Sequence, residues 1–268
     1  MIKKLLFILL AIALCGPVSA GPRDDAAAAW SRGDYAAALK ITRPLALKGE
    51  AWAQSFLGDS YRNGRGVAKN DAEAVKWYRL AAGQGIASAQ YKLGFMYAIG
   101  QAVLQDYAEA VKWYRLAAAQ GDASAQINLG VAYASGQGVL QDYAEGVKWY
   151  RLAAAQGDAD AQFNLGLSYE IGQGTLQDYA EAVKWYRLAA AQGNVVAQHN
   201  LGGMYSNGRG VLQDYTKAHA LYNLAASKGN AMAVKNRDLV AKRMTPQQIA
   251  DAQKLARDCL ARNFKGCD

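Results

Sequence analysis

A seventeen-residue stretch recurs in this chain at a constant interval. QDYAEAVKWYRLAAAQG occupies residues 105–121 and again 177–193, and residues 141–157 differ from it only at Gly146. Each copy begins 36 residues after the previous one. A fixed interval of this length is typical of stacked supersecondary units in which each unit contacts only its neighbours. The 268 residues hold about seven such units, so the repeat limits the fold to a linear array.

Each unit contains two helical patterns. In the first, over residues 122–136, Ala125 and Leu129 lie on one apolar stripe at helical spacing. The second follows a capping box, in which Asp106 accepts from the amide of Glu109 while the Glu side chain reaches back. Neither helix buries its stripe alone. The sequence therefore predicts an all-α fold, an α/α superhelical solenoid of about seven helix-turn-helix units with a 36-residue period.

The first twenty residues differ in kind from the repeats. Lys3 and Lys4 precede an apolar run that Pro17 ends, and small residues follow, which is the layout of a secretory signal peptide. We therefore expect residues 1–20 to be removed and the protein to be periplasmic or secreted. An alternative is a lipid-anchored form acylated at Cys15. No later apolar run reaches the length of a membrane span, so the mature protein is not expected to be transmembrane.

Degenerate units flank the regular ones. Residues 21–49 keep the pattern only loosely and are expected to form an N-terminal capping unit, while five regular repeats cover residues 50–229. Residues 230–268 are expected to form C-terminal capping helices. Thr245 as cap and Pro246 at the first helical position mark the start of the last helix.

Two thiols, Cys259 and Cys267, remain once the signal peptide is removed. In an oxidising compartment such a pair predicts one disulfide. The alternative is a pair of free or metal-binding thiols, although two cysteines supply few ligands for a metal.

The regular units resemble Sel1-like repeats, the longer relatives of tetratricopeptide repeats. The resemblance rests on residues 125–157, which combine an Ala-Gln-x-x-Leu-Gly opening, a Gly-x-Gly loop and a Trp-Tyr-x-x-Ala-Ala close. It implies an α/α superhelix whose first helices line the concave side. It also implies an adaptor that holds other proteins together, and for secreted bacterial relatives a connection to cell-envelope assembly, signalling or host contact.

One loop departs from the repeated pattern. Gly136-Gln137-Gly138 represents the usual loop, whereas the second copy has Ala102 at the position of Gly138. If this position needs a positive φ, Ala102 costs on the order of 1 kcal/mol. The alternative is a loop of different shape in this unit.

Positions that change from unit to unit are candidates for recognition, because constant positions build the stack. On the first helices, changing positions at i, i+3 and i+7 share one face. The candidate partner-binding residues on the expected concave face, with the polar residues beside them, are Tyr91, Lys92, Phe95, Ile127, Asn128, Val131, Phe163, Asn164, Leu167, His199 and Asn200. The polar members have the groups to hydrogen-bond a peptide backbone. The alternative is packing between helices, because apolar stripes at helical spacing are usually core.

Lys112, Lys148 and Lys184 recur one period apart, each followed three residues later by an arginine. We call this set the basic ladder, and it is a candidate for attracting an anionic envelope polymer. The alternative is a solvated face, since Glu109 precedes Lys112 by one helical turn. The formal charge of +8 is spread along the repeats, and in an exported chain this argues against nucleic acid as a partner.

The sequence gives little support for a catalytic function. The two histidines, His199 and His219, occupy positions that are apolar in the preceding unit, and no metal-ligand spacing stands out. The Gly-x-Gly loops lack the third glycine and preceding strand of a phosphate-binding loop. We therefore expect no catalytic residue, no cofactor and no metal, and the protein is predicted not to be an enzyme.

The sequence favours an exported scaffold that binds a protein or peptide partner of unknown identity on the concave face of the solenoid. The alternative is a cell-envelope polymer-binding protein. A third hypothesis is a β-lactam-binding or β-lactam-hydrolysing enzyme, because cysteine-rich members of the resembling family are linked to β-lactam binding. Cys259 and Cys267 match the cysteine spacing of those relatives, but the repeats themselves carry no cysteine.

Overall fold

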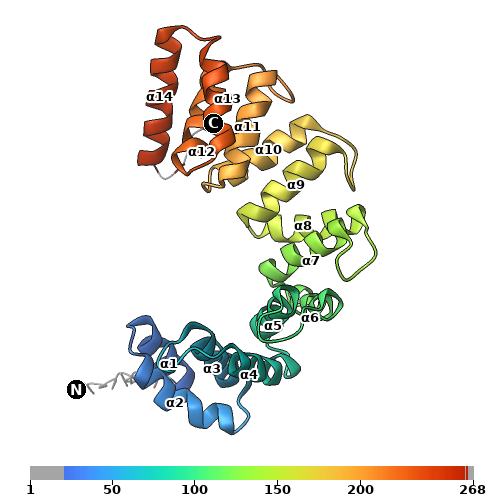
Figure 1. Ribbon diagram of the computed structural model, residues 1–268, viewed down its shortest axis with the longest axis vertical. Coiled ribbons are helices and arrows are strands. Elements are labelled where there is room, and N and C mark those ends of the chain that lie inside the picture. Colours follow the sequence, from blue (N-terminus) through green and yellow to red (C-terminus); the bar gives the residue numbers. More distant parts are fainter. Residues whose placement is uncertain (1–20, 263, 265–268) are drawn as a thin grey trace, which may run out of the picture.

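The computed structural model describes residues 21–262 and residue 264, and over these residues the chain forms fourteen α-helices and no strands. The first helices of the successive units are α1 (Pro22–Ser31), α3 (Ala51–Asn63), α5 (Ala87–Ile99), α7 (Ala123–Ser135), α9 (Ala159–Ile171), α11 (Val195–Asn207) and α13 (Ala231–Ala241). The second helices are α2 (Tyr35–Leu47), α4 (Asp71–Gly83), α6 (Tyr107–Ala119), α8 (Tyr143–Ala155), α10 (Tyr179–Ala190), α12 (Tyr215–Ser227) and α14 (Pro246–Ala261). The units follow one another along an arc that is open on one side (Figure 1). The predicted all-α superhelical solenoid is confirmed.

Three expectations fall outside the described residues. They are the signal peptide at residues 1–20, the acylation of Cys15 and the position of Cys267. Cys259 is buried on α14, and its bridge to Cys267 stays a prediction. Among the described residues, no helix combines the length and the apolar character that crossing a bilayer requires.

Capping residues begin the second helices as predicted. The Asp106 carboxylate accepts from the backbone amide of Glu109 at 2.9 Å. The expected return contact of the Glu109 side chain is wrong: its carboxylate accepts from Lys112 Nζ at 2.8 Å and from Trp113 Nε1 at 3.1 Å. These donors lie one turn further along α6 and hold the carboxylate away from the cap. A complete capping box forms at α14, where Thr245 exchanges both bonds with the third residue of the helix.

Left-handed residues end the helices and shape the loops. Gly121, directly after α6 and its C-cap, has a φ of 90°, and Gly138 in the Gly-x-Gly loop has a φ of 75°. Ala102, at the position of Gly138 in the second copy, also adopts a left-handed φ of 59°. This loop therefore keeps the common shape, and Ala102 carries the backbone strain.

A glycine–tyrosine contact joins the two helices of each regular unit. Gly130 on α7 lies against the ring of Tyr150 on α8, and a Cβ on this glycine would be 2.6 Å from the ring. Gly94, Gly166 and Gly202 make the same contact with the equivalent tyrosines. The tyrosine rings are buried, and burial raises the pKa of Tyr150 to about 12. The Leu-Gly pair of the repeated motif is thus explained by the close approach of the two helices.

Glutamine side chains connect consecutive units, and we call this series the glutamine ladder. Buried Gln126 donates to the Ala118 carbonyl at 3.2 Å and accepts from Gln156 Nε2 at 2.9 Å. The equivalent donor–acceptor pairs are Gln84 with Gln54, Gln120 with Gln90, and Gln192 with Gln162. The series breaks in the last repeat, where Lys228 occupies the donor position and the buried Oε1 of Gln198 has no hydrogen-bond partner among the described residues.

The C-terminal helix covers the end of the regular stack. Helix α14 packs against α12, where Ala252, Ala256 and Cys259 join Leu221 and Leu224 in one buried cluster. Leu224 is 2% exposed, whereas the equivalent leucines of the preceding repeats are about half exposed. Helix α12, the second helix of the last regular repeat, is therefore covered by α14 on a side that is exposed in the preceding second helices.

Candidate interaction surface

The variable positions of the first helices share one surface, which we call the first-helix face. It consists of the sides of α5, α7, α9 and α11 that carry the candidate residues, together with the adjoining sides of α3 and α13. Side chains connect neighbouring first helices directly at both ends. Lys92 Nζ on α5 lies 2.7 Å from the carboxylate of Asp59 on α3, and the side chain of Asn236 on α13 lies 2.9 Å from His199 Nε2 on α11.

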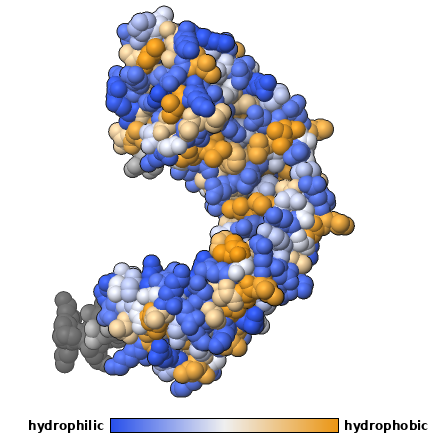
Figure 2. Space-filling model, in the orientation of Figure 1, coloured by the Kyte–Doolittle hydropathy of each residue, from blue (hydrophilic) through white to orange (hydrophobic). Residues whose placement is uncertain are grey.

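Exposure separates the variable positions from the constant ones. Of the eleven candidates, ten are half-buried and Val131 is 40% exposed. The constant leucines beside them, Leu93, Leu129 and Leu165, are 0% exposed. Constant residues therefore form the core, while each variable side chain keeps an accessible edge. Figure 2 shows apolar side chains that reach the inner edge of the arc in its middle units.

The aromatic candidates also pack against the next second helix along the chain. The ring centroids of Tyr91 and Tyr114 are 6.1 Å apart, and those of Phe163 and Tyr186 are 5.9 Å apart in a stacked arrangement. Ile127 contacts the core cluster of α8 and α9 in the same way. One edge of each of these side chains thus packs against the protein, and the other edge is accessible to solvent.

The polar candidates make different contacts from unit to unit. Asn128 donates to the carbonyl of Ser124 on its own helix at 2.8 Å. Asn200 donates to the hydroxyl of Tyr186 at 3.2 Å, and Lys92 forms its ion pair with Asp59. Lys92 and Asn200 therefore bridge consecutive units, whereas Asn128 makes its hydrogen bond within its own helix.

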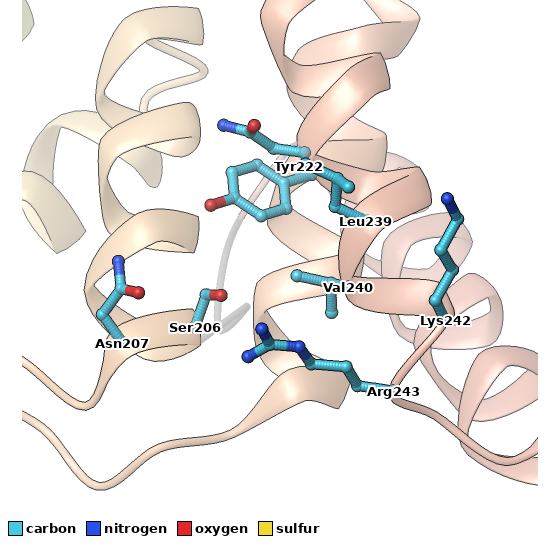
Figure 3. A pocket seen from close by; sticks show the side chains of 8 residues that line it. Ser206, Asn207, Tyr222, Leu239, Val240, Lys242 and Arg243 are labelled. Atoms are coloured by element: carbon cyan, nitrogen blue, oxygen red, sulfur yellow. The ribbon is translucent and has the colours of Figure 1, made fainter.

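Two adjoining pockets lie at the C-terminal end of the first-helix face. One, of about 460 Å³, lies between α11, α12 and α13, and the other, of about 320 Å³, extends from it to α9. Asn207, Tyr222 and Asn236 line both pockets, and we call the two together the C-terminal pocket. In Figure 3 the Tyr222 hydroxyl and the Arg243 guanidinium point toward the helix that carries Ser206 and Asn207.

The sequence reasoning missed several residues of this pocket. Asn236 lies 36 residues after Asn200, so extending the period by one unit would have found it. Gly203 lies 36 residues after Leu167, but a glycine at this position does not by itself indicate an opening in the surface. Arg209 and Arg243 gave no signal, because their position beside the pocket depends on how the last units stack.

The basic ladder is largely paired within its own helices. Lys112 Nζ lies 2.8 Å from the Glu109 carboxylate, and this hydrogen bond raises the pKa of Lys112. Lys148 pairs with its glutamate at 2.7 Å, and Lys184 pairs in the same way. Arg115 donates to the hydroxyl of Tyr133 at 2.9 Å. Each lysine of the basic ladder therefore already has an ion-pair partner on its own helix. Exposed ion pairs of this kind are weak, and salt screens them.

The two histidines have different surroundings, and neither belongs to a metal-binding cluster of the described residues. Over residues 21–262 and 264, no three His, Cys, Asp or Glu side chains come together in a metal-binding arrangement. His219 is buried on α12, and burial lowers its pKa. His199 makes hydrogen bonds to two asparagines on the first-helix face.

Helix pairs stacked one after another along the chain define an α/α solenoid repeat protein. The sequence model of the Sel1 repeat matches residues 53–86, 87–122, 123–158, 159–194 and 195–230. These segments cover more than half of the chain, and the chain belongs to the Sel1 repeat family. The Sel1 repeat fold generally mediates protein–protein interaction and is typically non-catalytic.

Solved structures share this architecture. The chain is similar to a protective antigen present in uropathogenic Escherichia coli strains that displays an SLR fold, with a TM-score of 0.79 and 34% identity over 92% of this chain and 55% of that one. It is also similar to a Sel1 repeat protein from Oxalobacter formigenes, with a TM-score of 0.77 and 34% identity over 81% of this chain and 87% of that one. The chain thus spans about half the length of the E. coli protein. A search of curated proteins gave no match.

Proposed function

We propose that this protein is an exported, non-enzymatic scaffold that binds a segment of a partner protein along the first-helix face. The observation that carries the proposal is the contrast in exposure between neighbouring positions. Constant residues such as Leu129 and Leu165 are 0% exposed, whereas the variable residues beside them keep an open edge. A surface that varies from unit to unit on an invariant core is suited to recognising an extended or helical segment.

We expect the aromatic residues of the first-helix face to provide most of its affinity for a partner. Tyr91, Phe95 and Phe163 are half-buried, and Tyr91 and Phe163 are each held on one edge by a tyrosine of the next second helix. A side chain that is already held in place loses little conformational freedom when a partner covers its other edge. Aromatic residues in such positions usually carry much of the binding energy of an interface.

Export is part of the proposal because of residues 1–20, whose sequence has the layout of a signal peptide. The likeness to a protective antigen of uropathogenic E. coli supports the same location. The polymer-binding alternative gains no support from the basic ladder, because Lys112, Lys148 and Lys184 each pair with a glutamate of their own helix.

The test is partner capture in living cells. Cross-linking followed by mass spectrometry of the captured proteins is compared between the wild type and the variant Tyr91→Ala/Phe95→Ala/Phe163→Ala. We expect the captured partner to decrease at least about tenfold, which corresponds to about 1.4 kcal/mol of binding free energy. Circular dichroism and thermal unfolding check that the variant remains folded.

A matched control removes exposed apolar side chains elsewhere. Leu104, Leu140 and Leu176 lie in the loops of three repeats and are 91%, 91% and 88% exposed. The triple alanine variant at these positions should capture the partner as well as the wild type. Equal loss in both triple variants, or no loss in the first-helix variant, would refute the proposal.

A further inference from the structure

We propose that the C-terminal pocket is the anchoring site for a carboxylate of the bound polypeptide. The inference rests on the proposed function, because it assigns a chemical class to one end of the partner segment. Arg209 and Arg243 line the pocket together with the amide side chains of Asn207 and Asn236, and Glu170 is its one acidic residue. An anionic group therefore matches the charge of the site.

The pocket forms at a position where this unit has a glycine and the three preceding units have a larger side chain. Gly203 on α11 occupies the position held by Leu167, Val131 and Phe95 in the preceding units. A Cβ at Gly203 would meet only the Tyr222 hydroxyl, at 3.7 Å. The space beside the Tyr222 hydroxyl is therefore open here, whereas a larger side chain occupies the equivalent position in the three units before it.

The positive charges also belong to this end of the face. The residues one and two periods before Arg209 are Gln173 and Gln137, and the residue one period before Arg243 is Asn207. Arg209 thus brings charge to the unit that has the opening, and Arg243 brings it to the unit that follows. The first repeat also has an arginine, Arg65, at the position of Arg209, but there Asp59 occupies the position of Gly203. The combination of the opening with the two arginines therefore distinguishes the C-terminal end of the face from the preceding units.

Aromatic rings hold both guanidinium groups in place. Arg243 Nη1 donates to the Tyr215 hydroxyl at 3.1 Å and its guanidinium lies 5.9 Å from the same ring, while Arg209 lies 5.7 Å from the ring of Tyr179. An arginine has five N–H donors, so these contacts leave donors for a ligand. Guanidinium groups in a fixed orientation match the two oxygens of a carboxylate.

A hydrogen-bonded chain fixes the opposite side of the pocket. The Asn236 amide donates to His199 Nε2 at 2.9 Å, so His199 carries its proton on Nδ1 and donates to Asn200 Oδ1 at 3.2 Å. Asn200 donates to the Tyr186 hydroxyl at 3.2 Å, which donates to the Glu170 carboxylate at 2.6 Å. The chain connects α13, α11, α10 and α9.

This network has two consequences for binding. Glu170 accepts a hydrogen bond from Tyr186, and its single negative charge is outnumbered by Arg209, Lys242 and Arg243 in the lining of the pocket. The amides of Asn200 and Asn236 are held before a ligand arrives, which reduces the conformational freedom lost on binding. The polar groups of the pocket are therefore in position before a carboxylate binds.

The carboxylate has two sources in a polypeptide, an acidic side chain and the free C-terminus. A peptide array separates them. Random twelve-residue peptides are attached either through the N-terminus, which leaves a free C-terminal carboxylate, or through an amidated C-terminus, which leaves only side-chain carboxylates. Purified protein is applied to both arrays, and the composition of the bound peptides is compared with that of the library.

We expect Asp and Glu to be enriched among the bound peptides when side chains supply the group, and binding confined to the free C-termini when the terminus supplies it. Arg209→Gln/Arg243→Gln should weaken the binding of these peptides about tenfold, or about 1.4 kcal/mol. Gly203→Leu, which installs the residue of the preceding unit, should do the same by filling the pocket. Lys148→Gln removes one charge from the basic ladder and should change nothing.

The outcomes separate this inference from the proposed function. Bound peptides without any preference for carboxylates, or an unchanged preference in the Arg209→Gln/Arg243→Gln variant, would overturn the anchoring site and leave the scaffold in place. Retained binding in the Tyr91→Ala/Phe95→Ala/Phe163→Ala variant would instead overturn the first-helix face and leave the pocket. No bound peptide on either array would refute both.

Discussion

The break in the glutamine ladder predicts that Lys228→Gln stabilises the protein. Gln198 is 0% exposed, and its Nε2 donates to the Ala190 carbonyl at 3.2 Å, while its Oε1 has no hydrogen-bond partner within residues 21–262 and 264. In the preceding repeat the same oxygen, on Gln162, accepts from Gln192 Nε2 at 2.9 Å. Lys228 is the C-cap of α12, the position that a glutamine occupies after α4, α6 and α8, so a glutamine fits its backbone.

The magnitude follows from three contributions. A buried polar atom without a partner costs about 1–3 kcal/mol, and a typical hydrogen bond that satisfies it contributes about 0.5–1.5 kcal/mol net. Removing the lysine from the C-terminal end of α12 loses about 0.3–1 kcal/mol of favourable interaction with the helix dipole. We therefore expect a net gain of about 1 kcal/mol in the free energy of unfolding, or about 2–4 °C in Tm for a chain of this size.

Denaturant unfolding measures the gain, and hydrogen exchange localises it to α11 and α12, because units of a solenoid can open separately. A double-mutant cycle isolates the bond: in a Gln198→Leu background, Lys228→Gln should give no gain. The reverse change, Gln192→Lys, should cost about 1–3 kcal/mol by leaving Gln162 without its donor. A neutral Lys228→Gln variant, or an equal gain in the Gln198→Leu background, would refute the reasoning.

Two further predictions concern strain and pH. Ala102→Gly should raise the free energy of unfolding by about 1 kcal/mol, because Ala102 has a φ of 59°. Gly138→Ala should lower it by more, because its Cβ would lie 2.3 Å from a backbone carbonyl oxygen of α6; denaturant titration of both variants checks the order. Burial and, secondarily, the charge of Arg237 lower the pKa of His219, against a smaller opposite effect of Asp238. Unfolded His219 therefore takes up a proton that the folded protein does not, so stability should fall as pH decreases through about 6.5. His219→Val, the residue type of the preceding repeats, should reduce this loss between pH 7.5 and 5.5, and an unchanged pH dependence would contradict the assignment.

Local patterns predicted most of the fold. The capping role of Asp106, the left-handed Gly121 and the start of α14 at Thr245 depend on residues within one turn of each helix end, and the structure has all three. The reciprocal part of the capping box was wrong because Lys112 and Trp113 compete for the Glu109 carboxylate. Competition of this kind is local, but its outcome depends on rotamers that a sequence pattern does not specify.

The candidate surface was predicted in part. Comparing units identified the positions that vary, and two of them, Leu167 and His199, line the C-terminal pocket. The pocket itself was missed, because a glycine at position 203 is as readily explained by close packing as by an opening. The period locates Asn236 as the counterpart of Asn200, but its hydrogen bond to His199 crosses between units and is not specified by any local pattern.

The sequence by itself determined the period, the two helices of each unit, their caps and the positions free to vary, because each depends on interactions within one unit or between identical neighbours. The tertiary structure alone decided which variable side chains keep an open edge and where a pocket forms. The reason is geometric: a small rotation between successive units places side chains of different units together, and that rotation arises from packing across the whole stack.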